Sequence, residues 1–313
     1  MIPKVSILIP VYNRENFIKR TIESALSQTY ENIEIVVVDN KSTDKTWEFL
    51  QEYSMKDQRI KIFQNEQNLG PVLNWKKCLE YSEGDYIKFL WSDDLISEDF
   101  LKKTVPILEK NEDIGFVYSK VKIFSELWET ITYDLKISSS KIPSEIFFKG
   151  ALLNEYSVPV SPGCAIFRKK DIKITELIPN GLKLSHLDYG AGNDLLIFLD
   201  VLIKYKYFYY IDEVLSMFRF HNDSLTVRND LNDYYITSKF FFVDENNLLY
   251  FYKKLYTNTY ISLLRKSKSF SFSKEKIRYI IEPFSNNEYK IDLLYLISKI
   301  LKKIFRLSND LGS

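Results

Sequence analysis

Two adjacent carboxylates, Asp93 and Asp94, are the side chains in this 313-residue chain best placed to do chemistry. They follow residues 87–91, a run that is apolar except for Lys88 and is typical of a buried strand. Because unpaired charge is strongly penalised in a core, the pair belongs at the end of that strand, where open α/β sheets bind ligands. Two hard oxygen ligands there suit a divalent cation held against a phosphate. The alternative is a solvated turn in which Asp94 caps a helix.

Two earlier strands are also predicted to end in polar residues. Residues 5–9 are apolar and are followed by Pro10, which cannot donate a ladder hydrogen bond and is expected to end the strand. Residues 33–38 form a second apolar run. The polar residues after these runs are Tyr12 and Asn13 in the first case and Asp39 in the second. Carboxylates at two separate strand ends favour a shared ligand site over coincidence.

The elements that must position these residues alternate between strand and helix. Apolar residues at helical spacing predict helices at 17–26, 47–50 and 75–81, and a third strand is predicted at 60–63. A β-loop-α unit repeated three times before a fourth strand predicts a mostly parallel sheet with helices on both faces. The fold class is therefore α/β.

The second half of the chain is predicted to be more mixed. A glycine-flanked turn at 190–194 opens a helix over 195–205 and places Asp194 in its first turn. Residues 207–211 and 214–220 are predicted to be a closing pair of strands, and 138–141 a mobile loop. From about Asn229 the pattern is helical. We therefore predict one domain at 1–225 and a C-terminal helical region at 226–313.

The composition excludes several classes of protein. Lysine plus arginine (43) nearly cancel aspartate plus glutamate (42), so no global field favours nucleic acid. The two cysteines make neither a disulfide framework nor a metal cluster. No run of about 18 apolar residues occurs, and the chain enters a strand directly with no signal peptide. A cytoplasmic setting is expected.

Taken together, these motifs resemble the inverting family-2 glycosyltransferases, which have the GT-A nucleotide-sugar-binding fold. The segments that carry the resemblance, in chain order, are Ser6–Asn13, Glu34–Asp44, Asn68–Gly70, Gly84–Asp94, Asn193–Asp194 and Phe218–Ser224. The ordered match spans roughly residues 3–226. It implies a GT-A catalytic domain followed by a C-terminal helical extension.

The resemblance also implies roles for individual residues. Pro10, Tyr12, Asn13 and Asp39 would hold the nucleoside, with the Asp39 carboxylate accepting from the imide N–H of the base. Asp93 would lie near the ribose, and Asp94 would bind Mn²⁺ or Mg²⁺ bridging the diphosphate. Asp194 matches the catalytic base. These roles suit the chemistry, because a cation neutralises the charge of a leaving diphosphate and a positioned carboxylate can take a hydroxyl proton.

Other positions are assigned by the same resemblance or depart from it. Asn68 belongs to a matching nucleotide-side motif, and Gly163 aligns with an acceptor-side loop. His221 would complete the metal shell or contact the diphosphate, or else is a polar residue at a strand end. Trp91 stands where many members have aspartate, and Trp75-Lys76 where many have Arg-Asn. Lys76 is a candidate diphosphate contact, with a solvated helix lysine as the alternative.

The C-terminal residues 293–306 have the pattern of a basic amphipathic helix. At about 100° per residue, the apolar residues fall on one half of the helix and the basic ones on the other. Such a helix can lie in an anionic membrane interface. Packing of the same face on the catalytic domain, or on a second copy in a homo-oligomer, is the alternative.

The sequence therefore predicts a cytoplasmic, metal-dependent inverting glycosyltransferase, at the inner face of the membrane if the last helix binds there. It would move a sugar from a nucleotide diphosphate donor, UDP-sugar favoured and dTDP-sugar second, to a hydroxyl of a saccharide or lipid-linked saccharide. Surface polysaccharide or glycolipid assembly is the expected setting. The alternatives are a non-catalytic nucleotide-sugar-binding protein and a sugar-phosphate nucleotidyltransferase, whose glycine-rich N-terminal loop is missing because no glycine precedes Gly70.

Overall fold

The computed structural model describes residues 2–174, 189–221, 224, 230–267, 275–278 and 291–299. Within them the chain forms two compact units, the first extending to Leu231 and the second beginning at Asn232. The predicted boundary at residue 225 itself lies outside the described residues. Each unit is described separately below.

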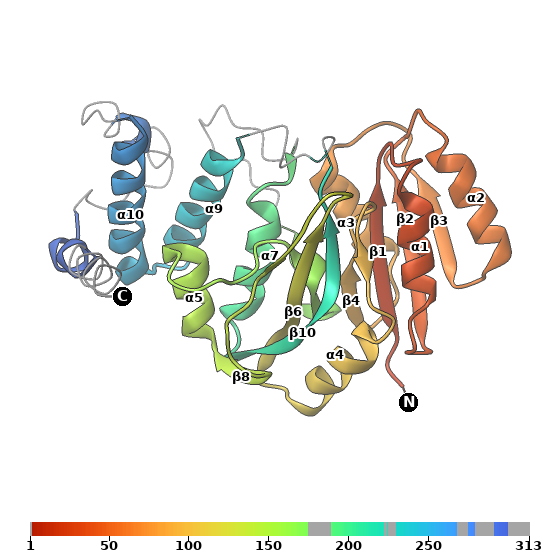
Figure 1. The fold of residues 1–313 in the computed structure, drawn as a ribbon, viewed down its shortest axis with the longest axis horizontal. Coiled ribbons are helices and arrows are strands. Elements are labelled where there is room, and N and C mark those ends of the chain that lie inside the picture. Colours follow the sequence, from red (N-terminus) through yellow and green to blue (C-terminus); the bar gives the residue numbers. More distant parts are fainter. Residues whose placement is uncertain are drawn as a thin grey trace. The chain divides into compact units, whose positions relative to one another are not determined.

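A ten-stranded sheet forms the centre of the first unit (Figure 1). Its main path runs β3-β2-β1-β4-β9-β6-β10-β5, while β7 pairs with β6 and β8 with β10. The strands are β1 (Val5–Val11), β2 (Ile33–Asp39), β3 (Ile60–Gln64), β4 (Tyr86–Phe89), β5 (Leu95–Ile96), β6 (Ile114–Phe124), β7 (Glu129–Thr132), β8 (Ser140–Pro143), β9 (Ala165–Arg168) and β10 (Tyr207–Arg219).

The first four strands are parallel, which confirms the prediction of three β-loop-α units. Pro10 does not end the first strand, contrary to prediction: it pairs with Val38, and β1 continues to Val11. The reason is that β4 pairs with β1 only up to Leu8. The backbone nitrogen of Pro10 faces the β4 side of β1, where β4 has already ended. Its missing N–H therefore removes no ladder hydrogen bond.

Helices cover both faces of this parallel part. On one face, Val5, Ile7 and Ile9 share a core cluster with buried residues of α1, α2 and α4. On the other, α3 packs on β1 and β2, as a right-handed crossover from β3 to β4 requires. The bounds are α1 (Ile18–Leu26), α2 (Thr46–Lys56), α3 (Pro71–Tyr81) and α4 (Phe100–Lys110).

The remaining strands correct two predictions. Residues 207–219 form the single strand β10, because its pairing with β6 shifts register around the exposed Asp212 and Glu213 and then resumes. Residues 140 and 141, the second half of the predicted mobile loop 138–141, belong to β8, which pairs with β10. The helical elements of this half are α5 (Ser144–Leu153), the 3₁₀ turns η1 (Pro162–Cys164) and η2 (Lys169–Asp171), and α7 (Asn193–Leu202).

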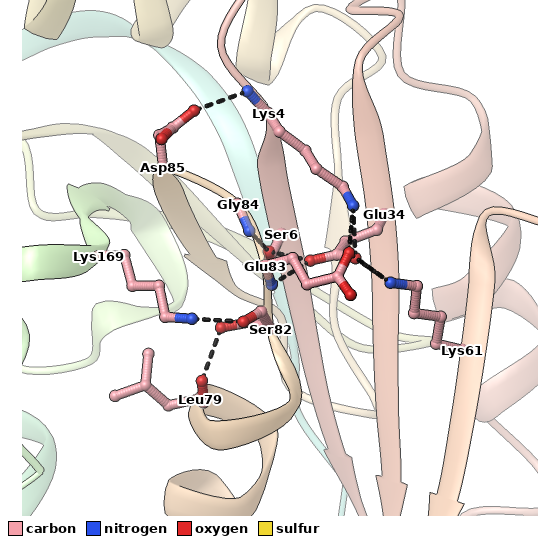
Figure 2. A network of polar contacts seen from close by, with 10 residues as sticks. All are labelled: Lys4, Ser6, Glu34, Lys61, Leu79, Ser82, Glu83, Gly84, Asp85 and Lys169. Atoms are coloured by element: carbon pink, nitrogen blue, oxygen red, sulfur yellow. Dashed lines mark hydrogen bonds and ion pairs between the residues drawn. The ribbon is translucent and has the colours of Figure 1, made fainter.

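Charged side chains join the amino ends of the parallel strands (Figure 2). Glu34 in β2 is 2% exposed and lies 2.9 Å from Lys4 Nζ and 2.8 Å from Lys61 Nζ. Its Oε1 accepts from Ser6 Oγ and from the amide of Glu83, each over 2.6 Å. The cluster therefore connects β1, β2, β3 and the turn that leads into β4.

The second unit is helical in its described part. Helices α9 (Asn232–Glu245) and α10 (Leu249–Ser267) pack on each other, with the rings of Phe240 and Tyr252 5.4 Å apart. Residues 293–299 of the predicted amphipathic segment are helical, and 300–306 lie outside the described residues. No helix in the described part of the chain is long and apolar enough to cross a membrane.

Candidate active site

The carboxylates of Asp93 and Asp94 lie in the turn between β4 and β5. The amide of Asp94 donates to the carbonyl of Trp91 over 3.0 Å, which closes the turn. The Oδ1 atom of Asp94 accepts a 2.8 Å hydrogen bond from the backbone N–H of Arg219, the last residue of β10. Asp94 is 5% exposed. The solvated-turn alternative is thus wrong, because this carboxylate is buried.

Asp93 connects three segments that are distant in sequence. Its Oδ2 lies 2.9 Å from Nε2 of His221 and 3.3 Å from Nε of Arg14, and its carbonyl accepts from Nε of Arg219 over 3.1 Å. Burial opposes ionisation of this group. The hydrogen bond with His221 and the charge of Arg14 outweigh it and hold the pKa of the Asp93 carboxyl below its usual value.

The neighbouring carboxyl is shifted the other way. Burial, and then the negative charge of Asp93, raise the pKa of Asp94 well above its usual value, against the N–H of Arg219 and the charge of Lys88. Two adjacent acids whose environments favour opposite protonation states are typical of functional sites. Added positive charge at this turn would favour the ionised form of both.

The donor set here fits a hard divalent cation that is only partly ligated by protein. No group of three His, Cys, Asp or Glu side chains within the described ranges is arranged to hold a metal. Mg²⁺ commonly binds through one or two carboxylates, with substrate phosphates and water completing the shell. In addition, His221 Nδ1 and Arg219 Nη2 are buried without a hydrogen-bond partner. An anionic group brought to the site would satisfy the Arg219 N–H, and a ring nitrogen of neutral histidine can be a metal ligand.

Asp39 ends β2 and is completely buried. Its carboxylate accepts from the amide of Ser42 over 3.1 Å, from the Ser42 hydroxyl, and from Gln64 Nε2 over 2.8 Å. Gln64 is the exposed last residue of β3. Ser42, in the loop after β2, thus binds both oxygens of the Asp39 carboxylate. The side-chain amide of Gln64 binds Oδ2 as well.

The loop after β1 is attached to the loop after β2. The amide of Asn13 donates to Ser42 Oγ over 2.9 Å, and Asn13 Oδ1 accepts from the amide of Thr43 over 2.8 Å. Asn13 has a φ of 50°, a left-handed conformation that asparagine tolerates. Because the next residue, Arg14, binds Asp93, an unbroken set of contacts runs from the Asp39 loop to Asp93.

Two other predicted nucleotide-side residues belong to the turn before α3 and to α3 itself. Asn68 Oδ1 accepts from Asn40 Nδ2 over 2.8 Å and from the amide of Gly70 over 2.9 Å. Asn68 thus supports the turn before α3. Lys76 is exposed on α3. Tyr12, which follows β1, is 40% exposed.

Asp194 lies in the first turn of α7, as predicted. Its Oδ1 accepts from the amides of Gly192 and Leu195 over 2.9 and 2.8 Å, and its own amide donates to the carbonyl of Gly190 over 3.2 Å. Asp194 is 9% exposed. Two N–H donors and the positive end of the helix dipole both favour the ionised carboxylate.

Gly163 lies in η1, which packs against α7 and β4. Its carbonyl accepts a hydrogen bond from Nζ of Lys88, a fully buried residue of β4. Two residues earlier, Ser161 Oγ accepts from Nε1 of Trp91 over 2.8 Å. The predicted acceptor-side loop is therefore attached to the strand and turn that carry Asp93 and Asp94.

Sequence reasoning missed four residues that contact these carboxylates: Arg14, Ser42, Gln64 and Arg219. Arg14 and Ser42 each lie three positions after the end of a strand, and Gln64 is the last residue of β3. A rule that examined every polar residue within three positions of a strand end would have found them. Arg219 falls inside the matching segment 218–224, but its backbone bond to Asp94 depends on pairing between distant strands.

Comparison with known proteins decides the family. The model of glycosyl transferase family 2 matches residues 6–174, which are 169 of the 313 residues. The chain belongs to glycosyltransferase family 2. An uncharacterized glycosyltransferase of Haemophilus influenzae is 42% identical over 109 residues, 35% of this chain and 44% of that protein. A putative teichuronic acid biosynthesis glycosyltransferase of Bacillus subtilis, TuaG, is 38% identical over 106 residues, 34% of this chain and 42% of that protein.

The aligned segments thus span less than half of the length of these relatives. A solved structure of S. aureus TarS 1–349, in complex with UDP-GlcNAc, superposes with a TM-score of 0.65 over 90% of this chain and 82% of that chain, at 17% identity. At this identity the likeness shows the fold, which is GT-A as predicted.

Proposed function

We propose that this family-2 protein is a metal-dependent, inverting glycosyltransferase that moves one sugar from a nucleoside diphosphate donor to an acceptor hydroxyl. The observation that carries the proposal is the connected polar network Asp39–Ser42–Asn13–Arg14–Asp93–His221 at the carboxyl ends of the parallel strands. Asp94 lies beside it. A UDP-sugar is the favoured donor, and the complex of TarS with UDP-GlcNAc supports this choice. Surface polysaccharide assembly is the proposed setting, supported by the likeness to TuaG.

The nucleoside would bind at Asp39. This carboxylate can accept the imide N–H of uracil if Gln64 releases the oxygen that it now holds at 2.8 Å. The released Gln64 amide would then lie beside the base. Tyr12, half-exposed at the same edge, offers a ring to stack on the base.

The diphosphate would bind between Asp39 and the end of β10. Asp94 and His221 would hold Mn²⁺ or Mg²⁺, which when bound would stabilise the charge that develops on the leaving diphosphate. Arg219, whose Nη2 lacks a hydrogen-bond partner, would add a second positive group there. Asp93 orients both side chains that it contacts, the guanidinium of Arg14 and the imidazole of His221.

Asp194 would act as the base. An ionised carboxylate at a helix start can take the proton of an acceptor hydroxyl as that oxygen attacks the anomeric carbon. Attack on the face opposite the diphosphate breaks the bond to the leaving group and inverts the configuration. Gly163 and the loop around it would lie on the acceptor side, because η1 packs against α7.

The test is a nucleoside-diphosphate-release assay, which detects UDP or dTDP, over a panel of UDP-GlcNAc, UDP-glucose, UDP-galactose and dTDP-glucose, with and without Mn²⁺. Thermal shifts with the same panel report donor binding by mass action. We expect Asp194→Asn to keep the donor-induced shift and to lose turnover by about 100-fold or more. Turnover by Asp194→Asn at the wild-type rate would refute the base assignment. Binding without UDP release by the wild type would indicate a non-catalytic nucleotide-sugar-binding protein.

A further inference from the structure

A contact path joins Asp94 to Asp194 through two tryptophans. The carbonyl of Trp91 accepts the amide of Asp94 over 3.0 Å. The indole ring of Trp91 lies 5.0 Å, centroid to centroid, from that of Trp75 on α3. Trp75 in turn lies against Gly190, whose carbonyl accepts the amide of Asp194 over 3.2 Å.

The two outer contacts of this tryptophan pair are made by glycines at which an added side chain would be crowded or would clash. A Cβ on Gly190 would lie 2.4 Å from Cη2 of Trp75, closer than real Cβ contacts occur, and Gly190 has a φ of 70°. A Cβ on Gly163 would lie 3.0 Å from Nε1 of Trp91. The pair is therefore enclosed between the loop that carries the base and the predicted acceptor-side loop.

Two hydrogen bonds attach the acceptor-side loop to the same frame. Trp91 Nε1 donates to Ser161 Oγ over 2.8 Å, and Nζ of Lys88 donates to the carbonyl of Gly163. Lys88 is completely buried, and its ammonium lies 4.0 Å from the ring centroid of Phe100. A buried lysine is costly, and the hydrogen bond to the Gly163 carbonyl offsets part of that cost.

We propose that Trp75 and Trp91 are positioning residues that set the separation between the diphosphate side of the site, at Asp94, and the base Asp194. Their indoles act as a spacer, because rings packed between backbone on both sides cannot shift without moving one of the two loops. Lys88 and Trp91 hold the acceptor-side loop in register with the same spacer. This inference rests on the proposed function, since it assigns a purpose to the distance between two proposed catalytic groups.

The test adds a methyl group at Gly190 and then removes the atoms of Trp75 with which that methyl group would clash. Gly190→Ala should lower UDP release from the preferred donor by about 100-fold, because misplacement of a reacting group by about 1 Å has that order of effect. UDP affinity in the presence of Mn²⁺, measured by calorimetry, should stay within about threefold. Trp75→Phe lacks Cη2 and Cζ2, the atoms nearest to the added methyl. The double variant Trp75→Phe/Gly190→Ala should therefore recover at least about tenfold of the lost rate.

Backbone strain of alanine at positive φ is the main competing explanation, and the double variant keeps it. If strain alone were responsible, Trp75→Phe would give no rescue, and that result would overturn the inference. A Gly190→Ala protein that releases UDP at the wild-type rate would overturn it as well.

A second pair of variants tests the contact between the rings of Trp75 and Trp91. Trp91→Phe keeps a ring against Trp75 and should keep more activity than Trp91→Ala, with melting temperatures recorded for both. Equal rates for the two folded variants would contradict a spacer role. Absence of UDP release by the wild type would refute the proposed function together with this inference, whereas an active wild type with an equally active Gly190→Ala refutes the inference alone.

Discussion

Replacement of Glu34 by glutamine should destabilise the first unit by removing one buried charge. Glu34 binds Lys4, Lys61, Ser6 and the amide of Glu83 at the amino ends of the strands (Figure 2). Burial alone would raise the pKa of this carboxyl. The hydrogen bonds, of which that from Lys61 is the strongest, lower its pKa from 4.5 to about 2.

The magnitude follows from linkage. The difference between pKa values of 4.5 and about 2, at about 1.4 kcal/mol per pKa unit, gives about 3.5 kcal/mol as an upper value. The two lysines are 30% and 34% exposed, so solvent screening reduces the expected loss to about 2 kcal/mol. Because the folded pKa is the lower one, this contribution is complete above pH 4.5 and is lost as the pH falls towards 2.

Urea unfolding followed by tryptophan fluorescence measures this loss. All four tryptophans, Trp47, Trp75, Trp91 and Trp128, lie in the first unit, so the signal reports on that unit alone. Glu83→Gln is the matched control, because Glu83 contacts the same two lysines at 2.8 Å but its side chain is 63% exposed. Glu83→Gln should lower the free energy of unfolding much less than Glu34→Gln does. Equal losses in the two variants, or a Glu34→Gln loss that does not shrink below about pH 4.5, would refute the reasoning.

Three further predictions follow from the site. Asp94→Ala should abolish the increase in UDP affinity that Mn²⁺ produces while leaving metal-free UDP affinity within about threefold, by calorimetry. Gln64→Ala should change UDP affinity by about fivefold, the effect of one hydrogen bond, and should leave affinity for inorganic pyrophosphate with Mn²⁺ unchanged. Lys88→Met should destabilise the protein least near neutral pH. Burial lowers the pKa of Lys88 from 10.5 to about 7. The unfolding free energy of the wild type relative to Lys88→Met should therefore rise as the pH rises through that interval. A flat difference in unfolding free energy would contradict the last prediction.

The parallel half of the fold could be predicted because each element carries its own signal. Apolar runs such as 33–38 and helical spacing in 17–26 are local patterns, and chain order then limits the topology. Predictions that depended on pairing between distant segments were less successful. The two segments 207–211 and 214–220 looked like two strands because Asp212 and Glu213 separate them, yet pairing with β6 continues beyond both.

The residues of the site also fall into two groups, those that local patterns predicted and those that they did not. The location of Asp39, Asp93, Asp94 and Asp194 at strand or helix ends could be predicted, because those ends are marked by abrupt changes from apolar to polar residues. Their partners could not. The contacts Arg14–Asp93 and Trp75–Trp91 join residues 79 and 16 positions apart, and no local pattern specifies such a pair. Trp75 and Trp91 were noted only as departures from the family pattern, and the structure shows that these two departures touch.

Carboxylates are treated in opposite ways at the two ends of the same four strands. At the amino ends, Glu34 has two ammonium groups and two further donors, so its charge is balanced within the protein and its pKa falls to about 2. At the carboxyl ends, Asp94 has one backbone donor and a charged neighbour, and its pKa rises. The arrangement at Glu34 contributes stability, and its charge is balanced without a ligand. The arrangement at Asp94 sacrifices stability, as functional sites commonly do, and a cation with its phosphate would supply the balance that the protein leaves out.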